Sequence, residues 1–448
     1  MQSPITLKLN QSGFFKGDST FANLQFLNLL AAQALTQVGV RLFDFVLAIQ
    51  IFNVTGSNAS VSYLILSYGL PALLFSSIAG VLVDRWNKKG TLILINLLRG
   101  IVVVTFIVAT KSFLIILFFA FLLSLITQFF VPIEGSLIPM IVKRRNLLSA
   151  NSVFTLTLYS SSVLGFMGAG PLIKTLGDRG AYIFVAGVFF IATLLVVFLP
   201  NKDKKQLFGF FKKSNHINVF TIADQIKEGL KIVKSSKYIK KSIIFMGMSQ
   251  VIVGMFMALM PGFAVSILGL SAEDSSLLLI GPASIGMVVG AVIIAKFGNG
   301  HSKSKIVSLG VFMSFVSFLL MSFLPEFNRN HMLDSFDFTF PINKGFMPVD
   351  VRSGIVLSAI ALTFITGMFN SFIVIPSTTL LQEKTSSKNR GKIYGFLQTV
   401  ITAGGALPIL FAGIFADFFG ISYVLRIISI IILIMFIFSL SYNARNNK

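Results

Sequence analysis

The sequence has no cysteine and few charged residues. Charged residues make up 12% of the 448 residues, and histidine occurs three times. The absence of cysteine excludes disulfides, thiolate metal sites, iron–sulfur clusters and cysteine nucleophiles. The three histidines are far apart in the chain and do not have the spacing of a metal site. Soluble proteins carry about 25% charged residues, so this composition excludes a soluble globular, a nucleic-acid-binding or a disordered protein.

Apolar residues occur instead in long runs. They make up 55% of the chain, and the mean hydropathy is +0.86. A helix needs about 20 mainly apolar residues to cross the hydrocarbon core of a bilayer, which is about 30 Å thick. Twelve such runs are present, at 24–52, 61–83, 91–110, 112–133, 149–173, 180–199, 242–268, 275–296, 305–324, 354–381, 394–418 and 420–441. We therefore predict an all-α integral membrane protein with twelve transmembrane helices.

The positive charges indicate how these spans are oriented. Lysine and arginine number 37 against 16 acids, a net charge of +21. In membrane proteins lysine and arginine collect in cytoplasmic loops. With the N-terminus inside, 28 of them fall in internal segments and six in external ones, and three lie within spans: Arg41, Arg99 and Arg426. Both termini are thus predicted to lie on the cytoplasmic side of the cytoplasmic (inner) membrane.

The runs divide the chain into two comparable halves. Residues 1–200 hold six spans, 201–241 form a basic linker, and 242–448 hold six more spans. Secondary transporters built from two six-helix repeats have this layout, with a site near the midplane between the repeats. In the linker, Thr221 and Asp224 resemble a capping box. We predict an amphipathic helix there, either on anionic lipid headgroups or packed on the helices. The external loop 325–353 is predicted to be a lid or a partly ordered hairpin.

The absence of an ATP-binding P-loop limits the possible energy sources for transport. The dipeptide Gly391-Lys392 lacks the upstream glycine of a P-loop, so ion gradients or downhill flow remain. A proton-coupled carrier needs a carboxylate inside the membrane. Of the sixteen acids, only Asp44 is placed clearly within a span, whereas Glu134 is placed near a span end. Several other charged residues fall in or near external segments: Lys174, Glu273, Asp274 and Asp417.

The first span therefore holds the main candidates for function. Arg41 precedes Asp44 by three residues, so the two side chains share a helix face. Asp44 is the candidate for binding a coupling proton, with Arg41 adjusting its affinity, and the alternative is a permanent structural ion pair. The same span carries three glutamines that are candidates for lining a cavity, or for hydrogen bonding between helices: Gln33, Gln37 and Gln50.

Two further patterns admit both a functional and a packing interpretation. Methionine (15) and phenylalanine (48) are frequent, and they could line a cavity for varied apolar molecules or face lipid. The fifth span carries Gly165, Gly168, Gly170 and Pro171, which suit either a pliable helix or close helix packing.

The loop between spans two and three carries the most specific motif, Gly80-Val-Leu-Val-Asp84-Arg85-Trp-Asn-Lys88-Lys89. It resembles the loop signature of the major facilitator superfamily, with Asn87 in place of the usual glycine. The resemblance implies a two-bundle fold of six helices each. It also implies a conformational gate at Gly80, Asp84, Arg85, Lys88 and Lys89 that stabilises the outward-facing state, and the alternative is an ordinary loop salt bridge.

Other segments resemble one branch of that superfamily. They include Thr55-Gly56-Ser57, Pro132 to Pro139, Ala150-Asn151-Ser152 and Arg390-Gly391-Lys392, and they are similar to the macrolide-efflux proteins, the enterobactin exporter and the lysophospholipid transporter. Related sequences often carry an acid near position 96, where this chain has Asn96, so Arg99 is expected to lack that charged partner one turn away.

The resemblance implies a secondary active exporter. We expect it to move an amphipathic small molecule (a drug, a macrolide-like compound or a siderophore-like metabolite) outward by alternating access in exchange for protons. No catalytic residue, cofactor or metal is expected, and a monomer is the default of the family. The alternatives are a lysophospholipid translocator, a facilitator without proton coupling, an integral membrane enzyme and a scaffold that does not transport.

Overall fold

The computed structural model describes residues 23–83, 86–109, 112–142, 147–199, 230–231, 233, 236–297, 302–329, 354–385 and 390–444. Within these ranges the chain is helical and forms no strand. The helices are α1 (Leu24–Thr55), α2 (Asn58–Val83), α3 (Lys88–Ala109), α4 (Phe113–Ile141), α5 (Leu147–Val197), α7 (Lys237–Ser266), η4 (Ser276–Ile280), α8 (Gly281–Phe297), α9 (Lys303–Ser322), α10 (Leu324–Arg329), α11 (Gly354–Lys384), α12 (Arg390–Phe419) and α13 (Ile421–Ala444).

The predicted spans correspond to these helices. Eleven of the helices are long and apolar enough to cross a membrane. One of them, α5, has 51 residues, and at 1.5 Å per residue an unbroken helix of that length would extend about 75 Å, more than twice the hydrocarbon core. Gly177 breaks it, because its φ of 68° and ψ of 175° lie outside the helical region and suit a residue without a Cβ. The predicted spans five and six therefore lie on either side of Gly177.

Large apolar side chains cover the outside of the molecule. Phe118, Phe198 and Phe418 are 61%, 73% and 80% exposed. Such exposure is unfavourable in water but favourable against acyl chains, and helices that are apolar on all faces are typical of membrane spans. The protein is therefore a multi-pass membrane protein.

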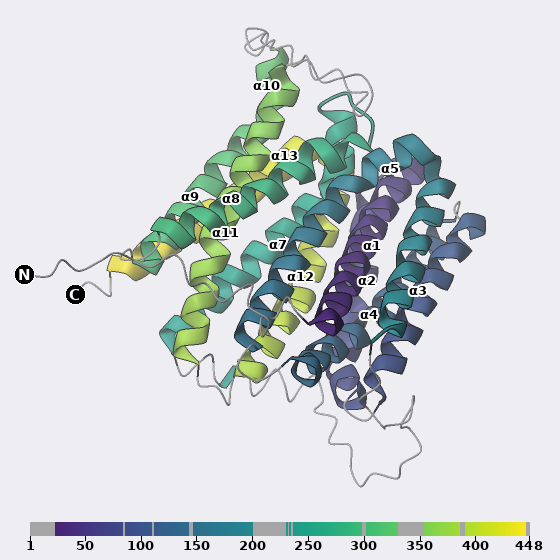
Figure 1. The fold of residues 1–448 in the computed structure, drawn as a ribbon. Coiled ribbons are helices and arrows are strands. Elements are labelled where there is room, and N and C mark those ends of the chain that lie inside the picture. The colour runs from purple at the N-terminus through teal and green to yellow at the C-terminus, as the bar shows by residue number, and fades with distance from the viewer. Residues whose placement is uncertain are drawn as a thin grey trace, which may run out of the picture.

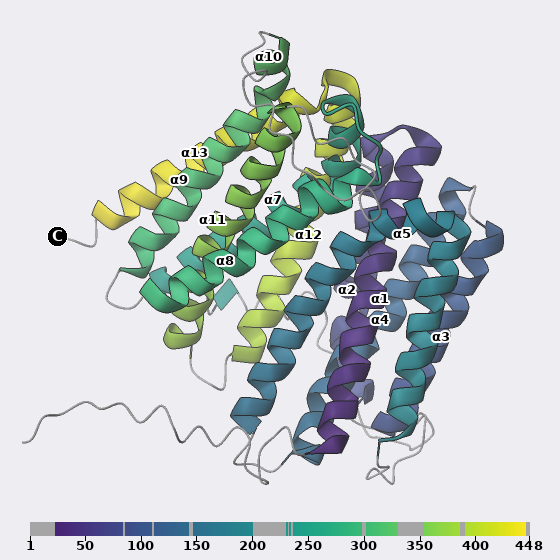
Figure 2. The ribbon, with the colours of Figure 1, turned by 45° about the horizontal axis from the view of Figure 1, so that its top comes forward.

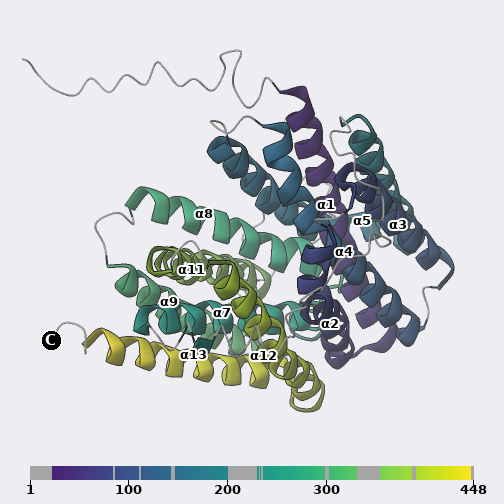
Figure 3. The same ribbon diagram turned by 90° about the horizontal axis from the view of Figure 1, so that it is seen from below.

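The helices form two groups that lie side by side. We call α1 to α5 the first group and α7 to α13 the second group (Figures 1 and 3). In the first group α1 and α3 pack on α5, and α2 packs on α4; in the second, α11 packs on α8 and α9, and α13 packs on α9. In the second group, α8, α9 and α13 run obliquely to the helices of the first group (Figure 2). Between the groups the most extensive contact is that of α2 with α12.

Some predictions fall partly or wholly on residues outside the described ranges. The predicted amphipathic helix of the linker does so at residues 201–229, so the domain boundaries stay predictions, although α7 already begins at Lys237. Of the external loop 325–353, the described part is the end of the short helix α10. There Glu326 forms an ion pair with Arg426 of α13.

Candidate functional site

The predicted charged pair of the first span is present in α1. Arg41 Nη1 lies 3.1 Å from Asp44 Oδ2, and the two side chains are 39% and 19% exposed. Arg41 lies at a close approach of α1 and α5, because a Cβ placed on Gly165 of α5 would lie 2.6 Å from Arg41 Cβ and 2.8 Å from the carbonyl oxygen of Val38. Gly165 therefore allows close helix packing, which is one of the two interpretations given for the glycines of the fifth span.

Two further charged residues are buried on different helices. Arg99 of α3 is fully buried and Glu134 of α4 is 3% exposed; each influences the charge of the other, although no direct ion pair joins these two described residues. The Arg99 guanidinium carbon lies 4.3 Å from the ring centroid of Phe130, one turn before Glu134. The apolar stretch of α4 ends at Ile138 and the helix ends at Ile141, so the position of Glu134 near a span end stays a prediction. Arg99 has asparagine, not an acid, one turn away in α3, as expected, and the acid that influences it comes from α4.

Polar side chains around Arg99 are only partly paired. Arg99 Nη1 donates to Asn96 Oδ1 at 3.3 Å, and Thr36 Oγ1 donates to the same oxygen at 3.4 Å. Within the described part of the chain, Arg99 Nε and Nη2 and Gln33 Oε1 have no hydrogen-bond partner. Buried polar groups are usually satisfied, so this incompletely paired network is a place where protonation or movement of one group changes the pairing of the others.

The three glutamines of the first span are all buried in α1. Gln33, Gln37 and Gln50 are 0%, 8% and 4% exposed. Gln33 Nε2 donates to the carbonyl oxygen of Phe154 in α5 at 3.3 Å, which is the bonding between helices that the sequence offered as an alternative. Their role in lining a cavity stays a prediction.

The predicted gate motif lies at the junction of α2 and α3. Asp84 and Arg85 lie outside the described residues, Gly80 lies in α2, and Lys89 Nζ donates to the carbonyl oxygen of Val197 at 2.7 Å. Lys88 is buried. The gating role stays a prediction.

Asn87, which replaces the usual glycine of that signature, has a clear local function. Its Oδ1 accepts a hydrogen bond from the backbone N–H of Gly90 at 2.8 Å. Asparagine is among the preferred N-cap residues, because its side chain satisfies a backbone donor of the first helical turn. The departure from the signature therefore caps α3.

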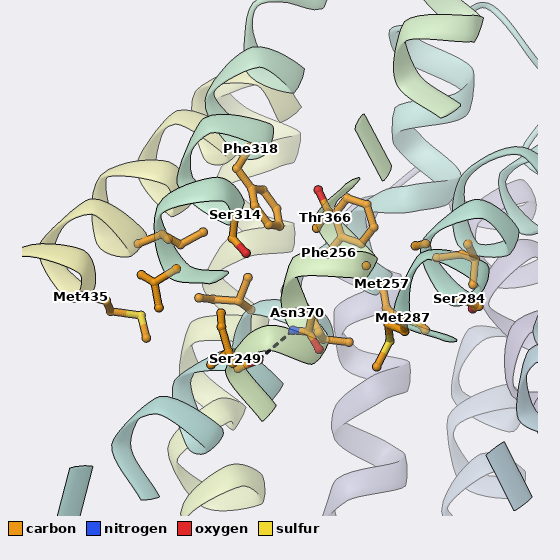
Figure 4. A pocket seen from close by; sticks show the side chains of 18 residues that line it. Ser249, Phe256, Met257, Ser284, Met287, Ser314, Phe318, Thr366, Asn370 and Met435 are labelled. Carbon is orange, nitrogen blue, oxygen red and sulfur yellow. Dashed lines mark hydrogen bonds between the residues drawn. The ribbon is translucent and has the colours of Figure 1, made fainter. Parts of the chain in front are cut away.

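A pocket lies inside the second group. Figure 4 shows side chains from α7, α8, α9, α11 and α13 directed towards it. Its volume is about 70 Å³, which is room for a few water molecules. None of its lining residues is charged, and they include Ser249, Phe256, Met257, Met287, Ser314 and Asn370. This places methionine and phenylalanine around a cavity, one of the two interpretations that the composition allowed.

A buried asparagine side chain supplies a polar group to the pocket. Asn370 is 8% exposed, and its Nδ2 donates to Ser249 Oγ at 2.7 Å (Figure 4). Its Oδ1 has no hydrogen-bond partner among the described residues. The sequence reasoning did not select this residue, although an asparagine within the apolar run 354–381 was the available signal.

The described residues include no group of three or more histidine, aspartate or glutamate side chains placed to hold a metal ion. The charged residues Arg41, Asp44, Arg99 and Glu134 lie in the first group, and the uncharged pocket lies in the second group.

Comparison with known proteins gives the family. The model of the Major Facilitator Superfamily matches residues 29–340. The chain belongs to the major facilitator superfamily. It is 23% identical over 406 residues to the MFS-type transporter YfiS of Bacillus subtilis, with 88% of each chain covered. It is 21% identical over 410 residues to macrolide efflux protein A of Streptococcus pyogenes, covering 89% of this chain and 91% of that protein.

A solved structure supports the major facilitator fold. A bacterial homologue of the human lysosomal transporter Spinster, in an inward-facing and occupied conformation, superposes with a TM-score of 0.69 at 12% identity. The match covers 96% of this chain and 97% of that one. This major facilitator protein is a membrane transporter and not an enzyme.

Proposed function

We propose that the protein is a secondary active exporter of the cytoplasmic membrane, which moves an amphipathic small molecule outward by alternating access in exchange for protons. The observation that carries this proposal is the Arg41–Asp44 pair inside α1. An intramembrane carboxylate is costly and marks an ion pathway more often than a structural contact. The similarity to macrolide efflux protein A along most of both chains supports export.

Asp44 is the better of the two buried acids for exchanging a proton with water. Its side chain is 19% exposed and that of its partner 39%, whereas Glu134 and Arg99 are 3% and 0% exposed. Protonation of Asp44 removes its charge and releases Arg41, so the pair has two states that differ by one proton. Glu134 instead lies within the packed core, where it has little access to water.

The pocket of the second group suits the apolar part of the cargo. Its lining is uncharged, so a charged group would be poorly solvated there. The free Oδ1 of Asn370 can accept one hydrogen bond from the cargo. A volume of about 70 Å³ is far below the few hundred Å³ of a ligand pocket, so binding requires the helices around the pocket to move apart.

The test uses purified protein in liposomes with an imposed pH gradient. A radiolabelled macrolide and a radiolabelled lysophospholipid serve as separate cargoes. We expect the gradient to accelerate macrolide transport several-fold, and Asp44→Asn to abolish this acceleration while cargo exchange without a gradient continues. Asp178→Asn, which alters an exposed acid, is the matched control and should behave as wild type.

Two outcomes contradict the proposal. Cargo-driven proton movement that persists in Asp44→Asn excludes Asp44 as the coupling site. Movement of lysophospholipid, but not of the macrolide, at a rate independent of the pH gradient indicates a lipid translocator instead.

A further inference from the structure

Several hydrogen bonds and an ion pair between described residues of the two groups lie at one end of the helices. Asn53 Nδ2 donates to Glu273 Oε1 at 2.7 Å, and Lys174 forms an ion pair with Asp274. The backbone N–H of Gly170 donates to Ser276 Oγ at 2.8 Å. These residues lie at the end of the molecule that the distribution of lysine and arginine predicts to be external. The two groups are therefore held together on that side.

The most completely bonded of these contacts is made by Asp417, near the C-terminus of α12. Its Oδ2 accepts from Ser57 Oγ at 2.6 Å and from the backbone N–H of Ala59 at 3.1 Å. Its Oδ1 accepts from the backbone N–H of Asn58 at 2.8 Å and from Asn58 Nδ2 at 2.9 Å. One carboxylate of the second group thus accepts four hydrogen bonds from the first group.

These bonds complete the N-terminus of α2. The first N–H groups of a helix have no partner within the helix. Ser57 acts as a local cap, because its Oγ accepts from the backbone N–H of Ser60 at 3.3 Å. The N–H groups of Asn58 and Ala59 remain, and Asp417 satisfies both from about 360 positions away in the sequence. A negative charge at this position is also favoured by the helix dipole.

Close packing makes the contact sensitive to the distance between the groups. A Cβ on Gly413 of α12 would lie 2.6 Å from the carbonyl oxygen of Asn58 and 2.8 Å from Ala59 Cα, so the backbones of α12 and α2 touch there. Hydrogen bonds weaken steeply with distance and angle. When the external ends separate, all four bonds are lost together, and water replaces them.

We propose that Asp417 with Ser57, Asn58 and Ala59 forms an external latch, which holds the outer face closed while the cytoplasmic face is accessible. This inference rests on the alternating access of the proposed function. The latch assigns Asp417 a role in setting the balance between the two states, separate from proton binding at Asp44. Neutralising Asp417 shifts the protein towards the outward-open state.

The test exploits the absence of cysteine from the chain. Ser62→Cys serves as a reporter, because Ser62 is fully buried, faces Gly413 across the α2–α12 contact, and is replaced by a residue of similar shape. A membrane-impermeant maleimide is added outside intact cells, and the labelling rate is measured. In the Asp417→Asn background we expect a rise of about tenfold or more, which corresponds to a shift of about 1.4 kcal/mol between the states.

Two controls separate the latch from other effects. Glu326→Gln removes an ion pair within the second group, and should leave the labelling rate of Ser62→Cys within about twofold of wild type, since ion pairs of this exposure contribute little. Ser429→Cys reports on unfolding, because Ser429 is fully buried in α13 and should stay unlabelled in every background.

An unchanged labelling rate in Asp417→Asn, or a rise matched by Glu326→Gln, overturns the latch. If Ser429→Cys becomes labelled in Asp417→Asn, that variant is unfolded. The labelling rate of Ser62→Cys is then measured in the Ser57→Ala background instead. Losing one of the four bonds should raise the rate about threefold, and no rise overturns the proposal. The measurement needs neither cargo nor a pH gradient, so a failure of the proposed exporter function and a failure of the latch give different results.

Discussion

Replacing Gly165 by alanine places a methyl group between α5 and α1, beside the Arg41–Asp44 pair. The new Cβ would lie 2.6 Å from Arg41 Cβ and 2.8 Å from the carbonyl oxygen of Val38, whereas ordinary contact begins at 3.4 Å. Because one of these neighbours is backbone, a change of rotamer cannot relieve the clash. The two helices must move apart, and the α1–α5 packing of the first group loosens.

The size of the effect can be isolated with a second glycine of α5, on the other side of the break at Gly177. Overpacking costs about 1–3 kcal/mol, and alanine gains about 1 kcal/mol over glycine in a helix. Gly187 also lies in α5, but a Cβ there has no atom within 4 Å. Gly187→Ala therefore has the higher helix propensity of alanine without the clash. The free energies of unfolding of the two variants should differ by about 1–3 kcal/mol.

Thermal denaturation of both variants in the same detergent measures this difference. We expect Gly165→Ala to unfold at a lower temperature than wild type or at most at the same one, and Gly187→Ala at the same or a higher one. Proton-driven transport should also fall in Gly165→Ala, because Arg41 moves with α1. Equal stability of the two variants would refute the close contact of α1 with α5, and with it the described setting of the charged pair.

Two further predictions concern buried charge and helix contact. Arg99→Met should destabilise the protein by about 3–5 kcal/mol, because it leaves Glu134 without a compensating charge. Adding Glu134→Gln should restore much of the lost stability in a denaturation assay. The absence of any rescue would contradict the electrostatic coupling of Arg99 and Glu134. Gly367→Ala should destabilise the protein by about 1–3 kcal/mol, because the new Cβ would collide with the backbone of Ala283 in α8. The control Gly404→Ala, whose Cβ has no atom within 4 Å, should be neutral or stabilising. A Gly367→Ala variant as stable as Gly404→Ala would disprove the α8–α11 contact.

The number and order of the helices followed from hydrophobic runs, because a span must be apolar over about 20 residues whatever its neighbours are. The same logic set the end of span four too early. Glu134 and the nearby glycine and prolines interrupt the run, yet α4 continues to Ile141.

The tertiary pairings could not be predicted from local patterns. Nothing near Asp417 in the sequence indicates that it caps a helix that begins at Asn58. Likewise, Ser249 and Asn370 are 121 positions apart and meet only because α7 packs on α11. Asp44 could be predicted because its partner lies one turn away in the same helix.

The uncharged lining of the second group's pocket has a consequence for how this transporter can change over time. The titratable pairs at Asp44 and Glu134 belong to the first group, and the pocket draws its lining from the second group. Exchanges among bulky apolar side chains such as Met257 and Met287 therefore change the shape of the pocket without altering the charged residues of the first group. The polar chemistry of the first group and the shape of the pocket are thus encoded by separate halves of the chain.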